Sequence, residues 1–290
     1  MQKMRYILLV CKNSLGKYIW KTPKVKTIDE TLDYIIETKS SVSRFGDGEF
    51  AVIQGRSNGF QDENQELGDR LARILKSERE GHIVCIPDVF GKLDFMKEKS
   101  KEFHIGLLNL ERREWLNLLN LEKVYGNAFF TRCYNMFEDK SSCPRWFEKN
   151  KKIWENQHVL LVEGEKSRLG VGNDLFENTG SVKRILCPSE NAYEKYDEIL
   201  KEILKYGKDR LILLALGMTA TVLAWELSGG GYWAIDIGHI DIEYEWFLRK
   251  TSDKIKIEGK YVNEVLGGKS NIADCNDEEY KSQIICKIVW

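Results

Sequence analysis

The sequence predicts an α/β fold whose mainly parallel, doubly wound sheet carries helices on both faces. Short apolar runs of strand character alternate with amphipathic helical segments along most of the 290 residues. The segment 211–216 is almost continuously apolar, as strands buried on both faces of a parallel sheet are. The chain is also long enough to bury the large core that such a sheet needs.

The first element that we expect is a helix that begins at Thr27. Thr27 and Glu30 have the spacing of a capping box, and apolar residues follow at helical intervals. Three further helical segments are expected in the first half, over 67–75, 103–119 and 146–154. The strands that we expect in this half are 41–45, 82–86 and 128–132.

The second half is more regular. Strands are expected over 158–163, 182–187, 211–216 and 232–236. Helices are expected within 191–206 and from 217–221 to Leu227. We therefore divide the chain into an N-terminal extension, 1–26, which the sequence leaves unplaced, and a single domain, 27–290.

Composition excludes several classes of protein. The 44 basic and 45 acidic residues are spread along the chain, which argues against nucleic-acid binding because that requires a basic face. No stretch approaches the roughly 20 apolar residues that cross a bilayer, so we expect no transmembrane segment, although peripheral association with a membrane remains compatible with the sequence. The seven cysteines form no Cys-x-x-Cys pair, so we expect buried free thiols and a cytoplasmic location.

The stretch 44–50, Arg-Phe-Gly-Asp-Gly-Glu-Phe, follows an expected strand and holds two carboxylates. In an extended chain Asp47 and Glu49 point to the same side, and the glycines at 46 and 48 allow a ligand to approach closely. Such a pair suits Mg²⁺ or Mn²⁺, which one or two carboxylates and substrate phosphates can hold. The alternative is a hairpin turn, because Asp-Gly between hydrophobic residues favours one.

A second junction, 163–174, lies between an expected strand and an expected helix. It contains Lys166, Ser167, Arg168 and Gly170, and backbone N–H groups at a helix start beside an arginine bind phosphate well. The loop matches neither the dinucleotide-binding nor the P-loop pattern. A surface turn is the alternative interpretation.

Two more junctions follow the last expected strands. Gly217 and Thr219 lie where a helix begins, so its open N–H groups can meet a nucleotide, or the helix is simply capped. His239 and Asp241 follow the strand 232–236, where a histidine flanked by carboxylates can act as a base, a metal ligand or a structural residue. All four junctions converge on one edge if the sheet is parallel.

With these motifs in place, the chain resembles the GT-D type glycosyltransferases, bacterial enzymes first catalogued as a domain of unknown function. The resemblance extends over 27–264 and rests on 43–50, 130–132, 162–174 and 234–241. It implies a Rossmann-like fold, a UDP-sugar donor and a divalent metal on an Asp-x-Glu motif, which falls on Asp47 and Glu49. One departure is Gly217-Met218-Thr219, where we expect Gly-Pro-Thr in the family.

We therefore expect metal-dependent transfer of a hexose from a UDP-sugar to a glycan or glycoprotein acceptor in bacterial surface polysaccharide or glycoprotein biosynthesis. Asp241 is the expected acceptor base, with His239 as its competitor. The residues expected to bind the nucleotide sugar are Arg44, Arg132, Lys166, Ser167, Arg168, Gly170, Gly217 and Thr219. The alternatives are a metal-dependent phosphohydrolase and a non-catalytic nucleotide-binding partner of a glycan assembly enzyme.

Overall fold

A nine-stranded parallel sheet runs through the part of the chain that the structure describes. The structure is a computed structural model, and it describes residues 10, 16, 19–270 and 272–290. The strand order is β1-β4-β3-β2-β8-β7-β5-β6-β9, and every pairing is parallel. The strands are β1 (Lys24–Val25), β2 (Ser41–Arg44), β3 (His82–Ile86), β4 (Val124–Asn127), β5 (His158–Gly164), β6 (Ser181–Cys187), β7 (Leu211–Ala215), β8 (Ala234–Asp236) and β9 (Ile284–Lys287).

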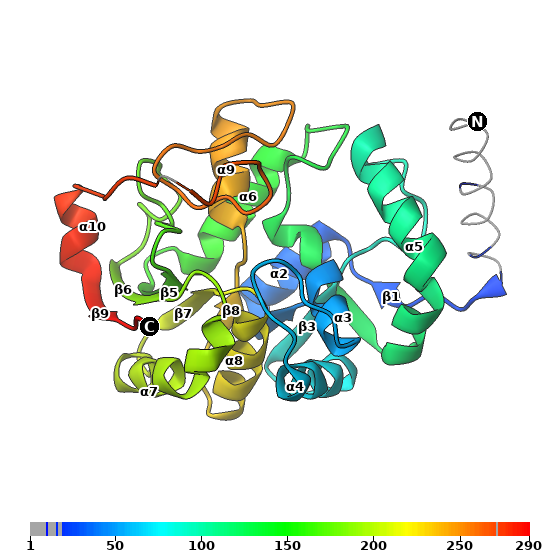
Figure 1. The fold of residues 1–290 in the computed structure, drawn as a ribbon, viewed down its shortest axis with the longest axis horizontal. Coiled ribbons are helices and arrows are strands. Elements are labelled where there is room, and N and C mark those ends of the chain that lie inside the picture. The colour runs from blue at the N-terminus through cyan, green and yellow to red at the C-terminus, as the bar shows by residue number, and fades with distance from the viewer. Residues whose placement is uncertain (1–9, 11–15, 17–18, 271) are drawn as a thin grey trace.

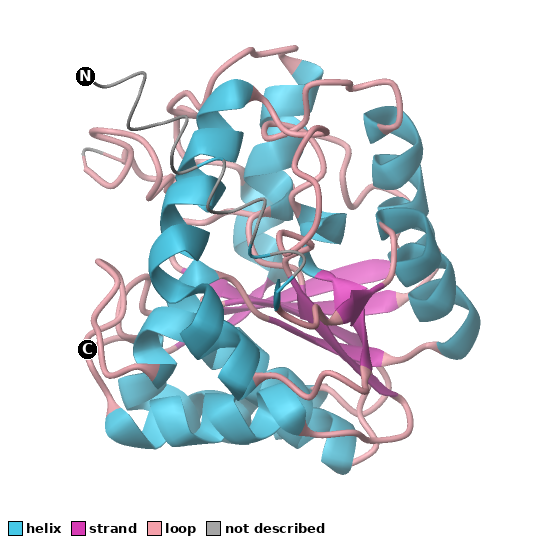
Figure 2. Cartoon of the chain, turned by 90° about the vertical axis from the view of Figure 1, so that its right-hand side faces the viewer, coloured by secondary structure: helices cyan, strands magenta, loops and turns pink. Residues whose placement is uncertain are grey.

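Helices lie on both sides of this sheet, so the predicted doubly wound α/β architecture is confirmed (Figure 2). In Figure 1, α4, α7 and α8 lie on one side of the sheet, and α6 and α9 lie on the other. The α-helices are α2 (Ile28–Thr38), α3 (Asp47–Ile53), α4 (Gln65–Lys76), α5 (Glu98–Leu118), α6 (Cys143–Trp154), α7 (Tyr196–Tyr206), α8 (Met218–Gly229), α9 (Ile240–Leu248) and α10 (Glu278–Gln283). Two 3-10 turns, η1 (Ala128–Thr131) and η2 (Ala192–Lys195), complete the described elements.

Local sequence signals explain where α2 begins and why α8 is central. The predicted capping box is confirmed, because the Glu30 N–H donates to Thr27 Oγ1 at 3.1 Å and the Thr27 N–H donates to Glu30 Oε2 at 2.8 Å. Helix α8 is apolar around most of its circumference and packs against β2, β7, β8 and α4. A helix of this kind is stable only when it is buried on several sides. Its burial holds the start of α8 rigidly at the edge of the sheet.

The predicted strand over 128–132 is wrong. The strand is β4, which ends at Asn127, and the next four residues form η1. The side chain of Asn127 accepts the N–H of Phe129 at 3.0 Å, a local turn that competes with continued strand pairing. The apolar pair Phe129 and Phe130 is buried in either conformation, so hydrophobicity alone did not distinguish them.

The two edge strands of the sheet, β1 and β9, lie in parts of the chain for which no strand was predicted. Strand β1 pairs with β4 and lies in the segment 1–26, while β9 pairs with β6. Of the cysteines, the six in the described residues are free thiols as predicted, and four of these are buried; Cys11 lies outside the described residues. No helix within the described ranges is long and apolar enough to span a bilayer.

Candidate active site

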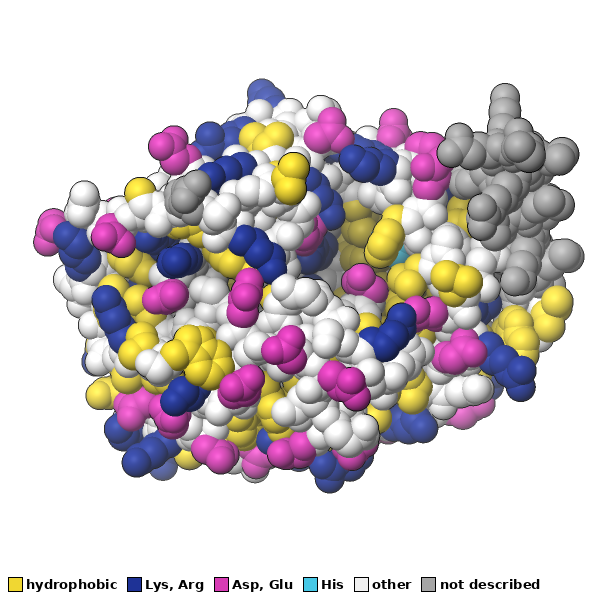
Figure 3. Space-filling model, in the orientation of Figure 1, with side chains coloured by type: hydrophobic (Ala, Val, Ile, Leu, Met, Phe, Trp, Pro, Cys, Tyr) yellow, Lys and Arg dark blue, Asp and Glu magenta, His cyan; other side chains and the backbone are white. Residues whose placement is uncertain are grey.

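A cavity of about 920 Å³ lies at the carboxyl ends of the strands. The segments that follow β2, β4, β5, β6, β7 and β8 all contribute to its lining. The predicted convergence of the four junctions is therefore confirmed, because each of them supplies at least one residue to this cavity. Its volume is within the range of small-molecule sites. Figure 3 shows basic and acidic side chains interspersed over the face drawn there, without a single basic patch.

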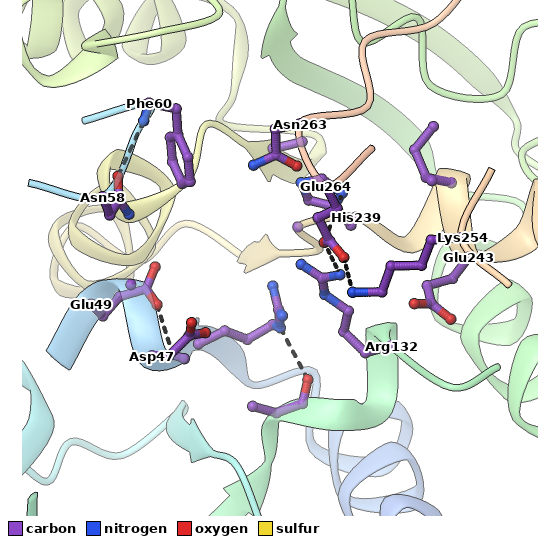
Figure 4. A pocket seen from close by; sticks show the side chains of 18 of the residues that line it. Asp47, Glu49, Asn58, Phe60, Arg132, His239, Glu243, Lys254, Asn263 and Glu264 are labelled. Atoms are coloured by element: carbon purple, nitrogen blue, oxygen red, sulfur yellow. Dashed lines mark hydrogen bonds and ion pairs between the residues drawn. The ribbon is translucent and has the colours of Figure 1, made fainter. Parts of the chain in front are cut away.

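One wall is the first turn of α3, which carries Asp47 and Glu49 (Figure 4). The expected extended geometry is wrong, and so is the alternative hairpin, because the chain passes from β2 directly into a helix that begins at Asp47. Glu49 folds back to the helix start, where Oε2 accepts the Gly46 N–H at 2.7 Å. This contact caps the start of α3 with the second carboxylate. Asp47 is exposed and Glu49 is half-buried.

Glu49 lies in a negative environment. Burial raises the pKa of its carboxyl to about 7, and the nearby carboxylate of Asp236 acts in the same direction, while Arg44 opposes both. A bound cation removes this penalty because it favours the ionised form. The wall is therefore suited to a positive ligand.

Asp236, at the end of β8, is buried and has three partners. It accepts from Thr221 Oγ1 at 3.1 Å and from the Gly238 N–H at 3.0 Å, and it lies 3.3 Å from Arg44 Nη1. Gly238 has a φ of +47°, and a Cβ there would lie 2.1 Å from Arg44 Nη1. Only glycine permits this close approach. Arg44 therefore lines the cavity but is also held in place as the partner of a buried carboxylate.

The facing wall holds Arg132 and Lys254 together with the carboxylates of Glu243 and Glu264 (Figure 4). Glu264 accepts hydrogen bonds from Arg132 and from Lys254, and its Oε1 lies 3.7 Å from His239 Nδ1. Burial raises the pKa of Glu264, but the adjacent cations outweigh it and hold the pKa well below its usual range. Although burial disfavours the charged guanidinium, the carboxylates of Glu264 and Glu243 raise the pKa of Arg132. The carboxylate of Glu264 thus orients two cations at one side of the cavity.

His239 lines the cavity between these cations and Asp236. Burial lowers the pKa of the imidazole to about 3, and Arg132 acts in the same direction. The ring is therefore neutral at physiological pH. Its Nδ1 is buried and has no hydrogen-bond partner within the described part of the chain, so it is available to a ligand.

A third wall combines an aromatic ring with the start of α8. Gly217 has a φ of +55°, and a Cβ there would lie 2.4 Å from the ring of Phe60. The loop that carries Phe60 is pinned, because the Asn191 N–H donates to the Phe60 carbonyl at 2.9 Å and the Asp62 N–H donates to Asn191 Oδ1 at 2.7 Å. No side chain caps α8, and Gly217 and Met218 at its start line the cavity, while the Ala220 N–H donates to the Gly217 carbonyl at 3.0 Å.

The predicted site residues separate into two groups. Those that line the cavity are Arg44, Asp47, Glu49, Arg132, Ser167, Gly217 and His239. Those that do not are Lys166, Arg168, Gly170, Thr219 and Asp241.

The expected helix after the junction 163–174 is wrong, because only turns follow β5 until β6 begins. Lys166 is exposed at the surface of this segment. Arg168 is buried and donates to the Gly259 carbonyl at 2.8 Å, so it ties two loops together. Thr219 is fully buried inside α8, and Thr221 donates to the Arg44 carbonyl at 2.8 Å instead of capping that helix. The backbone of Gly170 is held by Asp241.

Asp241 is completely buried and fully engaged. Its Oδ2 lies 2.7 Å from Lys260 Nζ, and its Oδ1 accepts from the Gly170 N–H at 2.8 Å and from Asn173 Nδ2 at 2.9 Å. A general base must reach the proton that it removes. The structure therefore does not support the predicted role of Asp241 as acceptor base, and it assigns this carboxylate to holding the loop after β5.

We expect Asp241→Asn to lower the free energy of unfolding by about 3 kcal/mol, because it leaves the buried Lys260 with a weaker set of partners. Turnover per folded molecule should remain close to that of the wild type, whereas His239→Ala should depress it. Urea unfolding curves and transfer rates corrected for the folded fraction measure both effects. A stable but inactive Asp241→Asn variant would restore Asp241 as the acceptor base.

The lining residues that were not predicted include Phe60, Lys254, Asn263 and Glu264. The dipeptide Asn58-Gly59 marks a turn, so an aromatic residue directly after it could have been noticed. The segment 252–266 has no periodicity, and no sequence pattern connects Glu264 with Arg132.

Comparisons with known proteins agree with this fold. The family model described as "Glycosyltransferase GT-D fold" matches residues 42–265. The chain belongs to this family. One similar solved structure is described as "The highly conserved domain of unknown function 1792 has a distinct glycosyltransferase fold". This GT-D chain is 39% identical to it, with a TM-score of 0.91, and the match covers 96% of this chain and 100% of the other. It is 40% identical, with a TM-score of 0.89, to "A New Glycosyltransferase (DUF1792) from Streptococcus sanguinis", covering 92% of this chain and 100% of that one.

Two curated relatives are longer proteins. The GT-D chain is 42% identical to "Glycosyltransferase GlyD" of Streptococcus pneumoniae, over 97% of this chain and 34% of the relative. It is 40% identical to "Probable glycosyl transferase Gly" of Streptococcus gordonii, over 91% of this chain and 39% of the relative. The chain therefore spans between a third and two fifths of the length of these relatives.

Proposed function

We propose that this GT-D chain transfers a hexose from a UDP-sugar to a glycan or glycoprotein acceptor, with the help of Mg²⁺ or Mn²⁺, in bacterial surface polysaccharide or glycoprotein biosynthesis. The observation that carries the proposal is the opposition of charges across one cavity. Asp47 and Glu49 lie on one wall, and Arg132 and Lys254 lie on another. A diphosphate and a divalent cation need these two kinds of neighbour.

The third wall supports a place for the nucleoside. The ring of Phe60 is half-exposed, lines the cavity and is fixed by its pinned loop. An aromatic face stacks on a base without selecting among bases. The start of α8 lies next to it and favours an anion. Together they fit a nucleoside whose phosphates point toward Arg132, and the choice of uridine follows from the family resemblance.

The carboxylates fit the implied metal. Glu49 uses Oε2 for the Gly46 N–H, which leaves Oε1, and Asp47 carries a further exposed carboxylate. Within the described residues no group of three or more His, Cys, Asp or Glu side chains is placed to hold a metal, so the donor phosphates would complete the coordination. When bound, the cation would stabilise the charge that grows on the leaving diphosphate.

The chain's own residues supply the remaining steps. Arg132, oriented by Glu264, binds and neutralises a phosphate of the leaving group. His239 is the predicted base that lies in the cavity, and its neutral ring can accept a hydrogen bond from the acceptor hydroxyl. Because a pKa near 3 makes imidazole a weak base, we assign His239 mainly to positioning that hydroxyl.

We expect UDP with Mn²⁺ to raise the melting temperature more than ADP, GDP or NAD⁺ does. A ligand at 100 times its dissociation constant adds about 2.7 kcal/mol of stability, which a thermal-shift assay resolves. An equal or larger shift with NAD⁺ would contradict the proposal. Release of phosphate from simple phosphate esters would favour a phosphohydrolase, and UDP binding without turnover of any UDP-sugar would favour a non-catalytic partner.

A further inference from the structure

A second cavity, of about 600 Å³, adjoins the proposed donor site. It lies between the start of α5, the segment that precedes α6, and the segment that follows α9. Lys97 and Ser252 line both cavities, so the two adjoin at this hydrogen-bonded pair. We call it the lysine cavity because Lys97, Lys140 and Lys250 all line it.

These three lysines lack acidic partners. Among the described residues no carboxylate lies within 4.0 Å of their ammonium groups, although many other lysines of the chain have such a partner. Lys97 donates to the Ser252 carbonyl, and Lys140 donates to the Thr251 carbonyl at 3.2 Å. Neutral carbonyls leave the positive charges uncompensated.

The like charges also affect one another. Burial lowers the pKa of Lys97, and the neighbouring Lys140 lowers it further, while Asp253 and Glu138 partly oppose this. Both acidic residues are exposed to solvent, where their effect is screened. An anion placed between the ammonium groups would relieve their repulsion.

Two aromatic residues also line the cavity, the buried Tyr134 and the half-buried Phe247. The ring of Tyr134 lies under Lys140 Nζ, 3.6 Å from its centroid, and the ring of Phe247 lies 5.7 Å from that of Tyr134 at 75°. Aromatic faces provide a broad apolar surface with fixed orientation. A group that combines a negative charge with a patch of C–H surface, such as an anionic sugar, matches this combination.

Asn135 connects the lysine cavity to the donor site. It lines the donor cavity, is 6% exposed, and its Nδ2 has no hydrogen-bond partner in the described chain. Its backbone is fixed, because its N–H donates to Glu243 Oε2 at 2.8 Å. A buried unpaired donor beside the shared residues Lys97 and Ser252 indicates a polar ligand group at this point.

We propose that the lysine cavity is an acceptor subsite for a glycan that carries an anionic group, with Phe247 as the apolar surface beside the sugar and Asn135 as a hydrogen-bond donor toward the donor site. This inference rests on the proposed function, because it names the class of acceptor for the same transfer. The shared chemistry is a carboxylate or a phosphate on a sugar ring.

The first test measures binding of simple sugars to the full chain. Glucuronic acid and glucose 1-phosphate represent the two sources of charge, and methyl glucoside is the neutral match. We expect either or both of the anionic sugars to bind by calorimetry or by ligand-observed NMR, and Lys97→Met/Lys140→Met to weaken that binding at least tenfold. The control Lys201→Met/Lys208→Met changes two exposed lysines outside both cavities and should bind as the wild type does.

A second variant guards against misfolding. Lys250 is exposed at the rim of the lysine cavity, so Lys250→Glu should fold normally and still weaken binding of the anionic sugar. Stabilisation by UDP and Mn²⁺ should remain unchanged in Lys250→Glu and in the Lys201→Met/Lys208→Met control, because none of these residues lines the donor cavity. In a transfer assay, the KM for an anionic acceptor should rise while the KM for the donor stays the same.

Two results would overturn the proposal. One is equal binding of the anionic sugars and methyl glucoside, or binding that does not depend on the three lysines, while UDP still stabilises the chain. The other is lysine-dependent binding to vesicles of anionic phospholipid without binding of either anionic sugar, which would assign the lysines to a membrane surface. A third result would separate the two proposals. If UDP has no effect on the chain but the anionic sugars still bind through the lysines, the proposed donor is wrong and the anion site stands.

Discussion

Asp47→Asn and Glu49→Gln are each expected to reduce metal-dependent turnover about 1000-fold or more. Each change removes a negative charge from the wall that we assign to the cation. Stabilisation of the leaving diphosphate by a metal is worth several kcal/mol, and each 1.36 kcal/mol corresponds to a factor of ten in rate. Transfer rates at saturating Mn²⁺, corrected for the folded fraction, measure the effect. Both variants should also lose the extra thermal stabilisation that Mn²⁺ adds in the presence of UDP.

The same variants should not lose stability without ligands. Glutamine retains a carbonyl oxygen that can accept the Gly46 N–H, and it removes a carboxylate from the vicinity of Asp236. The pKa of Glu49 is raised from 4.5 to about 7 in the folded chain, so its ionisation lowers stability as the pH rises from 4.5 through 7. Glu49→Gln should therefore melt higher than the wild type at pH 8 and nearly the same at pH 4.5. A large loss of apo stability together with normal turnover per folded molecule would refute the metal site.

Arg132→Ala is expected to lower turnover about 100-fold or more and to raise the KM for the donor. The guanidinium is half-buried, is oriented by Glu264, and faces the carboxylate wall across the cavity. Removing one preorganised donor to a developing negative charge typically costs about 100- to 1000-fold in rate. Arg132→Lys should recover part of the activity, because it keeps the charge and loses the planar fork. Steady-state kinetics with varied UDP-sugar separate the two parameters.

Two further variants distinguish a binding role from a structural one. Glu264→Gln should produce a smaller loss than Arg132→Ala, since it leaves the guanidinium present but less firmly oriented. Arg145→Ala removes an arginine that pairs with Asp29 at the surface, away from the cavity, and should leave the kinetics unchanged. An unchanged donor KM and turnover in Arg132→Ala would show that this residue serves only Glu264.

The fold class and one edge of the site follow from the sequence. The spacing of apolar residues distinguishes strand from helix in elements with a well-defined buried face or a continuous apolar run. Examples are β5, β7 and the helix that Thr27 caps. Once the sheet is parallel, the carboxyl ends of its strands must share one edge, so Asp47, Gly217 and His239 had to meet there. The sequence fails at η1, where a side-chain turn at Asn127 competes with strand pairing among equally apolar residues.

Only the tertiary structure decided which charged residues face the cavity. Asp241 and Arg168 have the residue types and the positions of site residues, yet Asp241 is bound by Lys260 and Arg168 by the Gly259 carbonyl, and neither lines the cavity. Glu264 and Lys254 come from an aperiodic segment that no strand leads into, but they complete the wall around Arg132. The physical reason is that the local spacing of apolar residues shows which side of an element is buried. The partner of a buried charge, by contrast, comes from a segment distant in sequence, so only the packed chain identifies it.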